Sequence, residues 1–210
     1  MDDAGKVIGL IIVIVLIVGG VLFGVSRCQQ DEITTLEQQV DFLEKEYVPM
    51  EFEITKKTDD EIKLQAIFYD LKGDKVGSQV IKIDGSELNI DFRIRKISEN
   101  GYLFFPYGIY SDKVPMSESI KLYDEYDDKG FPAIYNGITD IKDDEGEKLN
   151  RKSKKTIEEQ LETEFANIKS VESGGIALHD LENISNFKKN TIYKVVCHPS
   201  TGTLDYRIRQ

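Results

Sequence analysis

The sequence predicts a mainly β protein, α+β overall, in which a transmembrane helix and a short coiled-coil stem precede an antiparallel β-sandwich-like domain. Three observations lead to this fold class. An uncharged apolar run fills residues 7–25, apolar and polar residues alternate after residue 50, and a helical stripe follows residue 156. The stripe predicts one C-terminal amphipathic helix, and the chain closes with a terminal hairpin.

Composition limits the classes of partner. About 180 residues follow the apolar run, enough for one medium domain or two small ones with a hydrophobic core. The formal net charge of the chain is -11 at pH 7, which repels nucleic acid, so no nucleic-acid partner is expected. The two cysteines, Cys28 and Cys197, are too few and too far apart for a disulfide framework.

The N-terminal segment is predicted to be a retained membrane anchor over 7–26, after a short tail over 1–6. Nineteen uncharged residues from Val7 to Val25 span about 28 Å as a helix, close to a hydrocarbon core. A cleaved signal needs a basic start and a small-x-small exit, whereas this run starts "MDDAGK" and exits "FGVSRC". A lipoprotein signal needs a small residue before Cys28, and Arg27 stands there.

A stem over 30–48 follows the anchor. Gly20 and Gly24 have the GxxxG spacing that lets two membrane helices pack closely. Beyond them, apolar residues recur at alternating spacings of three and four, as in a coiled-coil seam: Ile33, Leu36, Val40, Leu43 and Tyr47. Because so short a helix is marginal alone in water, we expect either a homodimer through these residues or a stripe packed on the following domain.

Residues 50–138 are predicted to form the β domain. In "ELNIDFRIRKI" apolar and polar residues alternate from Leu88 to Arg95, which is typical of a half-buried antiparallel strand. The runs "EFEIT", "EIKLQAIFYD" and "SQVIKI" are similar, and turn residues in "TDDE", "KGDK", "DGSE" and "SENG" separate them. A strand about every ten residues is typical of a β-sandwich.

An aromatic strand at "GYLFFPYGIYSDKVP" is the predicted partner-binding surface. Pro106 cannot donate to a ladder, so this strand is expected to be an edge strand or to break in its middle, with one of the adjacent Phe104 and Phe105 facing outward. The alternative is an ordinary core strand with bends. The residues predicted to face a partner are Tyr102, Tyr107, Tyr110 and Phe131.

The last third of the chain begins with a charged linker or loop over 139–155. A capping box of Thr156 with Glu159 predicts where a helix starts, and its apolar stripe comprises Ile157, Leu161, Phe165 and Ile168. "TIYKVVCH" and "TLDYRIR" are predicted to form a hairpin joined by "PSTG", with Leu204, Tyr206 and Ile208 facing inward. The segment 156–210 either completes the sandwich or is appended to it.

Candidate catalytic residues are few. Cys197 could pair across strands with His179, and Arg207 could then steady an oxyanion. With an N-terminal anchor and an all-β domain, this order resembles sortase transpeptidases in architecture. The motif differs, because a sortase carries T-L-x-T-C where "YKVV" precedes Cys197 in this chain. The sortase histidine also lies much further upstream of its cysteine than His179 lies upstream of Cys197. No metal or cofactor motif is present, so neither is predicted.

The sequence therefore predicts a non-catalytic, single-pass membrane protein of the cell envelope that acts as an interaction or scaffold component. Its expected partners are the membrane, another envelope protein and, through the stem, a second copy. Residues 30–210 are expected outside the cytoplasm, because long domains are translocated largely regardless of charge. Two alternatives remain: a sortase-like envelope cysteine transpeptidase or hydrolase, and a membrane adaptor of inverted topology that faces the cytoplasm.

Overall fold

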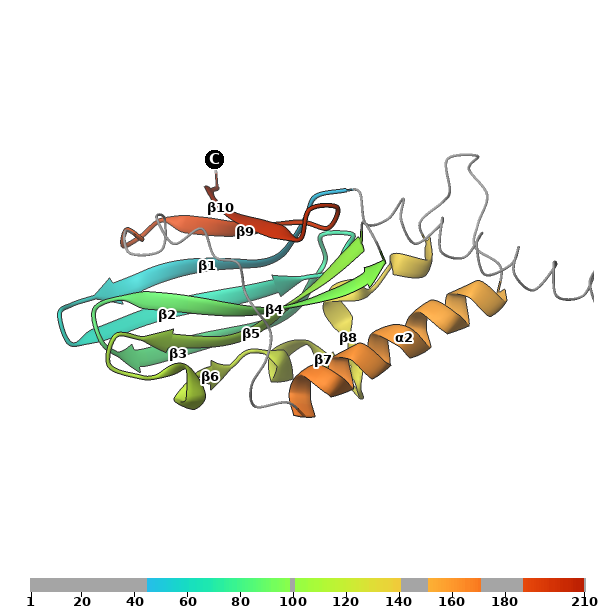
Figure 1. The fold of residues 1–210 in the computed structure, drawn as a ribbon. Coiled ribbons are helices and arrows are strands. Elements are labelled where there is room, and N and C mark those ends of the chain that lie inside the picture. Colours follow the sequence, from blue (N-terminus) through green and yellow to red (C-terminus); the bar gives the residue numbers. More distant parts are fainter. Residues whose placement is uncertain (1–44, 99–100, 141–150, 171–186, 210) are drawn as a thin grey trace, which may run out of the picture. The chain divides into compact units, whose positions relative to one another are not determined.

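The computed structural model describes residues 45–98, 101–140, 151–170 and 187–209 (Figure 1). All of them belong to one compact unit, Val40–Gln210. The expected anchor over 7–26, with Gly20 and Gly24, lies outside the described residues. So do the stem residues Ile33, Leu36, Val40 and Leu43.

The mainly β prediction is confirmed, because antiparallel strands make up most of the described elements. Strand β2 has the alternating burial that its sequence pattern predicts. The half-buried prediction is wrong for the middle of β4, because Asp91 and Arg93, on the face expected to be exposed, are buried as well. The strands are β1 (Tyr47–Lys57), β2 (Glu61–Tyr69), β3 (Lys75–Asp84), β4 (Leu88–Ser98), β5 (Gly101–Ser111), β6 (Ile120–Lys121), β7 (Asp127–Asp128), β8 (Phe131–Pro132), β9 (Ile192–His198) and β10 (Thr203–Ile208). The described α-helix is α2 (Arg151–Ser170), and the 3₁₀ turns are η1 (Met116–Glu118), η2 (Tyr123–Tyr126), η3 (Ala133–Tyr135) and η4 (Ile138–Asp140).

The larger sheet has five antiparallel strands in the order β10-β9-β1-β2-β3. Figure 1 shows the C-terminal hairpin, drawn in red, beside β1, drawn in blue, and Met50 pairs with Val195 in this register. The hairpin therefore completes the sheet that begins with β1. Of the residues expected to face inward on β10, Leu204 is buried, Tyr206 is half-buried and Ile208 is 58% exposed. The inward prediction is wrong for Ile208, because it lies at the end of an edge strand.

The heptad pattern of the sequence extends to Tyr47, but β1 begins at this residue. The helical prediction is therefore wrong for Tyr47 and Val48. Long-range contacts decide the backbone here: Tyr47 pairs with Cys197 of β9, and its hydroxyl lies 2.7 Å from that of Tyr135. Tertiary pairing of this kind overrides a local helical pattern.

The smaller sheet, in the order β4-β5-β6, places the aromatic strand between two neighbours. β5 continues through Pro106, with an extra residue, Tyr107, bulged out between the pairs Asp91–Gly108 and Phe92–Pro106. The expected break is therefore wrong. β6 pairs only with Gly108 and Ile109, so β5 has a free edge on that side at Pro106, as its missing N–H requires.

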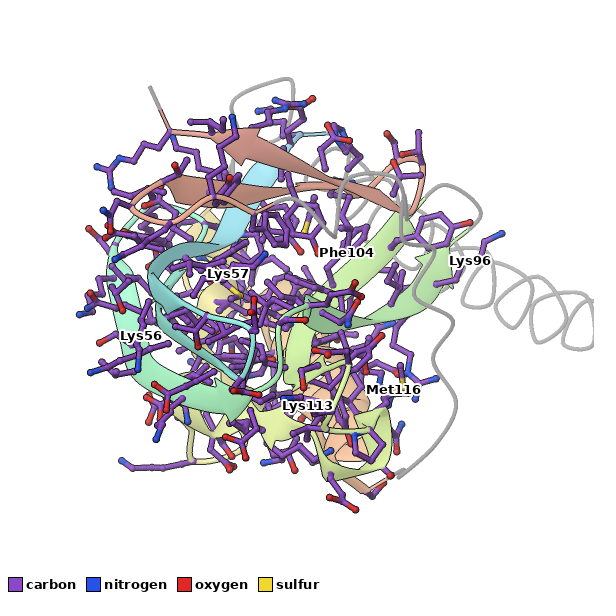
Figure 2. All side chains as sticks on the ribbon, turned by 90° about the vertical axis from the view of Figure 1, so that its left-hand side faces the viewer. Lys56, Lys57, Lys96, Phe104, Lys113 and Met116 are labelled. Carbon is purple, nitrogen blue, oxygen red and sulfur yellow. The ribbon has the colours of Figure 1, made fainter. Side chains whose placement is uncertain are left out.

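Phe104 and Phe105 are both fully buried, so the expectation that one of them faces outward is wrong. Both faces of β5 are covered. Phe105 stacks on Phe165 of α2 with ring centroids 5.9 Å apart, and Phe104 lies among the strands in Figure 2, whereas Lys96 extends at the periphery. Side chains from both sheets and from α2 form one core cluster.

Helix α2 begins at Arg151, five residues earlier than the capping box predicts. Thr156 is therefore wrong as the predicted helix start, and residues 151–155 are helix where a linker was predicted. Lys and Arg are good helix formers, and a polar first turn cannot be told from a loop by polarity alone. The predicted stripe is confirmed, since all four of its members are buried: Ile157, Leu161, Phe165 and Ile168.

Candidate functional site

The four residues predicted to face a partner lie in three different surroundings. Tyr107 is only 3% exposed, whereas Tyr102, Tyr110 and Phe131 are half-buried. Tyr102 packs beneath the β9-β10 turn, where its ring atoms lie 3.0–3.1 Å from the position a Cβ would take on Gly202. The structure therefore does not join them into one aromatic surface.

Tyr107 is enclosed by two cations. The guanidinium carbon of Arg93 lies 4.2 Å and Nζ of Lys121 lies 4.4 Å from the ring centre. Lys121 also donates hydrogen bonds to the Tyr107 hydroxyl at 3.3 Å and to Ser119 Oγ at 3.2 Å. Such contacts stabilise a buried ring by about 1–2 kcal/mol each when desolvated. Tyr107 is therefore part of the domain's own packing.

The free edge of β5 is occupied by tyrosine hydroxyls. The Tyr135 hydroxyl accepts a hydrogen bond from Phe104 N at 2.7 Å and donates one to Phe104 O at 3.0 Å. The Tyr126 hydroxyl donates to Pro106 O at 2.8 Å. Because η2 and η3 supply these partners, the aromatic edge that the sequence predicts for a partner is satisfied within the chain.

Phe131 lines a cleft that no sequence pattern predicted. We call it the acidic cleft; it lies between α2 and the loop that follows β8, and has a volume of about 280 Å³. Its lining residues are Phe131, Tyr135, Asn136, Gly137, Ile138, Thr139, Glu158 and Glu162. Glu158 and Glu162 are exposed and stand one turn apart on α2. An acidic pair at this spacing is the one sequence signal that could have pointed to the cleft.

The cations near this cleft are engaged elsewhere. Lys72 Nζ lies 2.6 Å and Lys154 Nζ 4.0 Å from carboxylate oxygens of Asp140, and Lys155 Nζ lies 3.4 Å from Glu159. Within the described ranges, no cation lies within ion-pair distance of Glu158 or Glu162. Among the described residues, the two cleft glutamates therefore have no ion-pair partner, and the half-buried ring of Phe131 lies beside them.

A second polar cluster, which we call the hairpin clamp, joins the start of β1 to the C-terminal hairpin. The His198 ring lies between Glu46 Oε1 at 3.3 Å and Asp205 Oδ2 at 2.9 Å, and Arg207 contacts the same two carboxylates at 2.8 and 3.0 Å. The hydrogen bond from Arg207 lowers the pKa of Glu46, and that from His198 lowers the pKa of Asp205. The clamp holds the residue next to β1 against β9 and β10.

The proposed catalytic residues lie in different environments. Cys197 is fully buried on the inner face of β9, and burial raises the pKa of its thiol. Arg207 points the other way, into the hairpin clamp, since it alternates along β10 with the buried Leu204. His179 lies outside the described residues. The structure thus does not bring Cys197 and Arg207 together.

Three further observations bear on function. Over residues 45–98, 101–140, 151–170 and 187–209, no group of His, Cys, Asp and Glu side chains could hold a metal ion. In the same ranges no helix is long and apolar enough to cross a membrane. No family model, curated protein or solved structure matches this chain.

Proposed function

We propose that this chain is a non-catalytic interaction or scaffold protein of the cell envelope, held by one N-terminal membrane helix and displaying an acidic β-rich domain outside the cytoplasm. The observation that carries this proposal is the run of nineteen uncharged residues, Val7–Val25, with no acceptable cleavage site, ahead of a domain with its own core.

The structure of the domain supports binding in preference to catalysis. Nucleophilic cysteines sit in exposed, electropositive surroundings with a lowered pKa, whereas burial raises the pKa of Cys197. The acidic cleft, by contrast, has the concave shape and mixed apolar and charged lining of a recognition site. The finer fold assignment, a β-sandwich-like domain, is supported by the single core that the two sheets share.

The experiment is protease accessibility of the full chain in intact cells, spheroplasts and lysed cells, followed with an antibody against the domain. We expect digestion of the domain in spheroplasts, with a protected fragment that contains the anchor. Protection until lysis would establish the inverted, cytoplasm-facing topology instead. Recovery of the domain in the soluble fraction would refute the anchor.

A thiol-labelling measurement addresses the sortase-like alternative. In the native full chain we expect iodoacetamide to modify Cys28 and to leave Cys197 unmodified until urea unfolds the domain. Rapid labelling of native Cys197, abolished at low pH, would indicate a reactive thiolate and would support the enzyme.

A further inference from the structure

We propose that the acidic cleft binds a lysine or arginine side chain of a partner protein. This inference rests on the proposed function, because it names the chemistry of the partner that an interaction domain would recognise. The occupant is chosen by charge complementarity: Glu158 and Glu162 supply two exposed carboxylates, and Phe131 supplies a half-buried aromatic ring.

The walls of the cleft match the two parts of such a side chain. Long basic side chains bury an aliphatic stem on apolar surface while the charged end stays near solvent. The half-buried ring of Phe131 offers the apolar surface, and the two glutamates stand at the exposed side on α2. An aspartate or glutamate side chain would meet repulsion here, and a purely apolar one would leave the carboxylates unpaired.

The domain already contains one interaction of this kind beside the cleft. The stem of Lys72 lies against Gly137, with Cε 2.6 Å from the position a Cβ would take, and Nζ reaches Asp140 at 2.6 Å. Gly137, with φ +90°, is needed both for its backbone conformation and for this approach. A partner's lysine would extend the same arrangement by one more cation, toward Glu158 and Glu162, which have no ion-pair partner among the described residues.

The test is a binding titration of full-length protein in neutral detergent micelles, using a fluorescein-labelled decapeptide of alternating lysine and glycine. Its matched probe carries norleucine in place of every lysine. We expect saturable binding of the lysine peptide at 0.15 M salt and none of the norleucine peptide. Glu158→Gln with Glu162→Gln should weaken binding by roughly three- to thirtyfold, the effect of two exposed ion pairs.

The control is Glu87→Gln with Glu118→Gln, two exposed glutamates outside the cleft whose loss changes net charge equally. Equal weakening by both double variants would show general attraction to an acidic domain and would overturn the inference, as would no saturable binding at millimolar peptide. Phe131→Leu should also weaken binding; because Phe131 packs against the core, its binding is measured at a temperature at which circular dichroism shows the variant to be folded. Either negative result leaves the membrane topology, tested by proteolysis, unaffected.

Discussion

The Tyr135 hydroxyl forms hydrogen bonds with the backbone of β5 at an edge where no strand pairs with it. It has one proton, which it donates to Phe104 O, so Tyr47 must be the donor in the 2.7 Å contact between the two tyrosines. Tyr135→Phe leaves the buried Phe104 N–H without its acceptor, and we expect the free energy of unfolding to fall by about 1–3 kcal/mol. Equilibrium unfolding in urea measures this change in the free energy of unfolding.

A matched control for this substitution is Tyr123→Phe. The Tyr123 hydroxyl makes no hydrogen bond with another described residue, and its ring remains against Tyr107 in either variant. We expect a change under about 0.5 kcal/mol, as for most substitutions that remove no buried interaction. Equal effects of the two substitutions would mean that the β5 edge does not depend on Tyr135.

Arg93 is 7% exposed, and its Nε lies 3.2 Å from Asp91 Oδ2, close enough for an ion pair although not aligned for a hydrogen bond. Arg93→Met removes the cation of this buried ion pair, and we expect a loss of about 3–5 kcal/mol in unfolding free energy. Arg95→Met is the comparison, because Arg95 is about one third exposed and lies 3.8 Å from Glu164. Its loss should cost under about 1 kcal/mol.

Among the elements, the C-terminal hairpin depends on pH through the hairpin clamp. The pKa values of Glu46 and Asp205 are held below their ordinary 4.5 and 3.8, so the stability they contribute is present above those values and is lost as pH falls through the lowered ones. We expect hydrogen exchange in residues 46–50 and 203–208, corrected for intrinsic rates, to increase below about pH 4.5.

Arg207→Gln removes the largest cause of the Glu46 shift and should reduce this pH dependence, whereas Arg209→Gln, which breaks a 3.0 Å contact with Glu51, should leave it unchanged. Protection that stays constant from pH 6 to pH 3 in the unsubstituted chain would show that the clamp contributes no stability.

The elements also show what local patterns can predict. A strand such as β2 follows from strict alternation, because one buried face requires it. The start of α2 could not be predicted, because a polar first turn resembles a loop. The burial of both Phe104 and Phe105 could not be predicted either, because the faces of β5 are covered by segments distant in sequence. The acidic cleft likewise forms only when the segment around β8 packs beside α2. From the sequence alone, Glu158 and Glu162 therefore have the pattern of ordinary surface residues of a helix.

At the scale of the whole molecule, self-association through the stem stays a prediction from the sequence. Cys28 lies two residues beyond the proposed anchor over 7–26, so mild oxidation of native membranes should link two copies through a Cys28 disulfide if parallel stems pair. Leu36→Lys with Leu43→Lys places charge in the seam and should reduce that product severalfold. Thr34→Lys with Gln38→Lys, at positions on the outer face of the stem, should leave the amount of that product unchanged. A chain with no disulfide-linked dimer before substitution would contradict the prediction.

The pairing of β1 with β9 means that the larger sheet cannot be completed until the C-terminal hairpin has been synthesised. β1 is among the first parts of the domain to be synthesised, yet its partner on one side is near the end of the chain. Until β9 arrives, β1 presents an unpaired backbone edge, and non-local pairing of this kind is slow. A nascent or truncated chain that ends before Ile192 leaves that edge of β1 unpaired and is thus expected to aggregate through it.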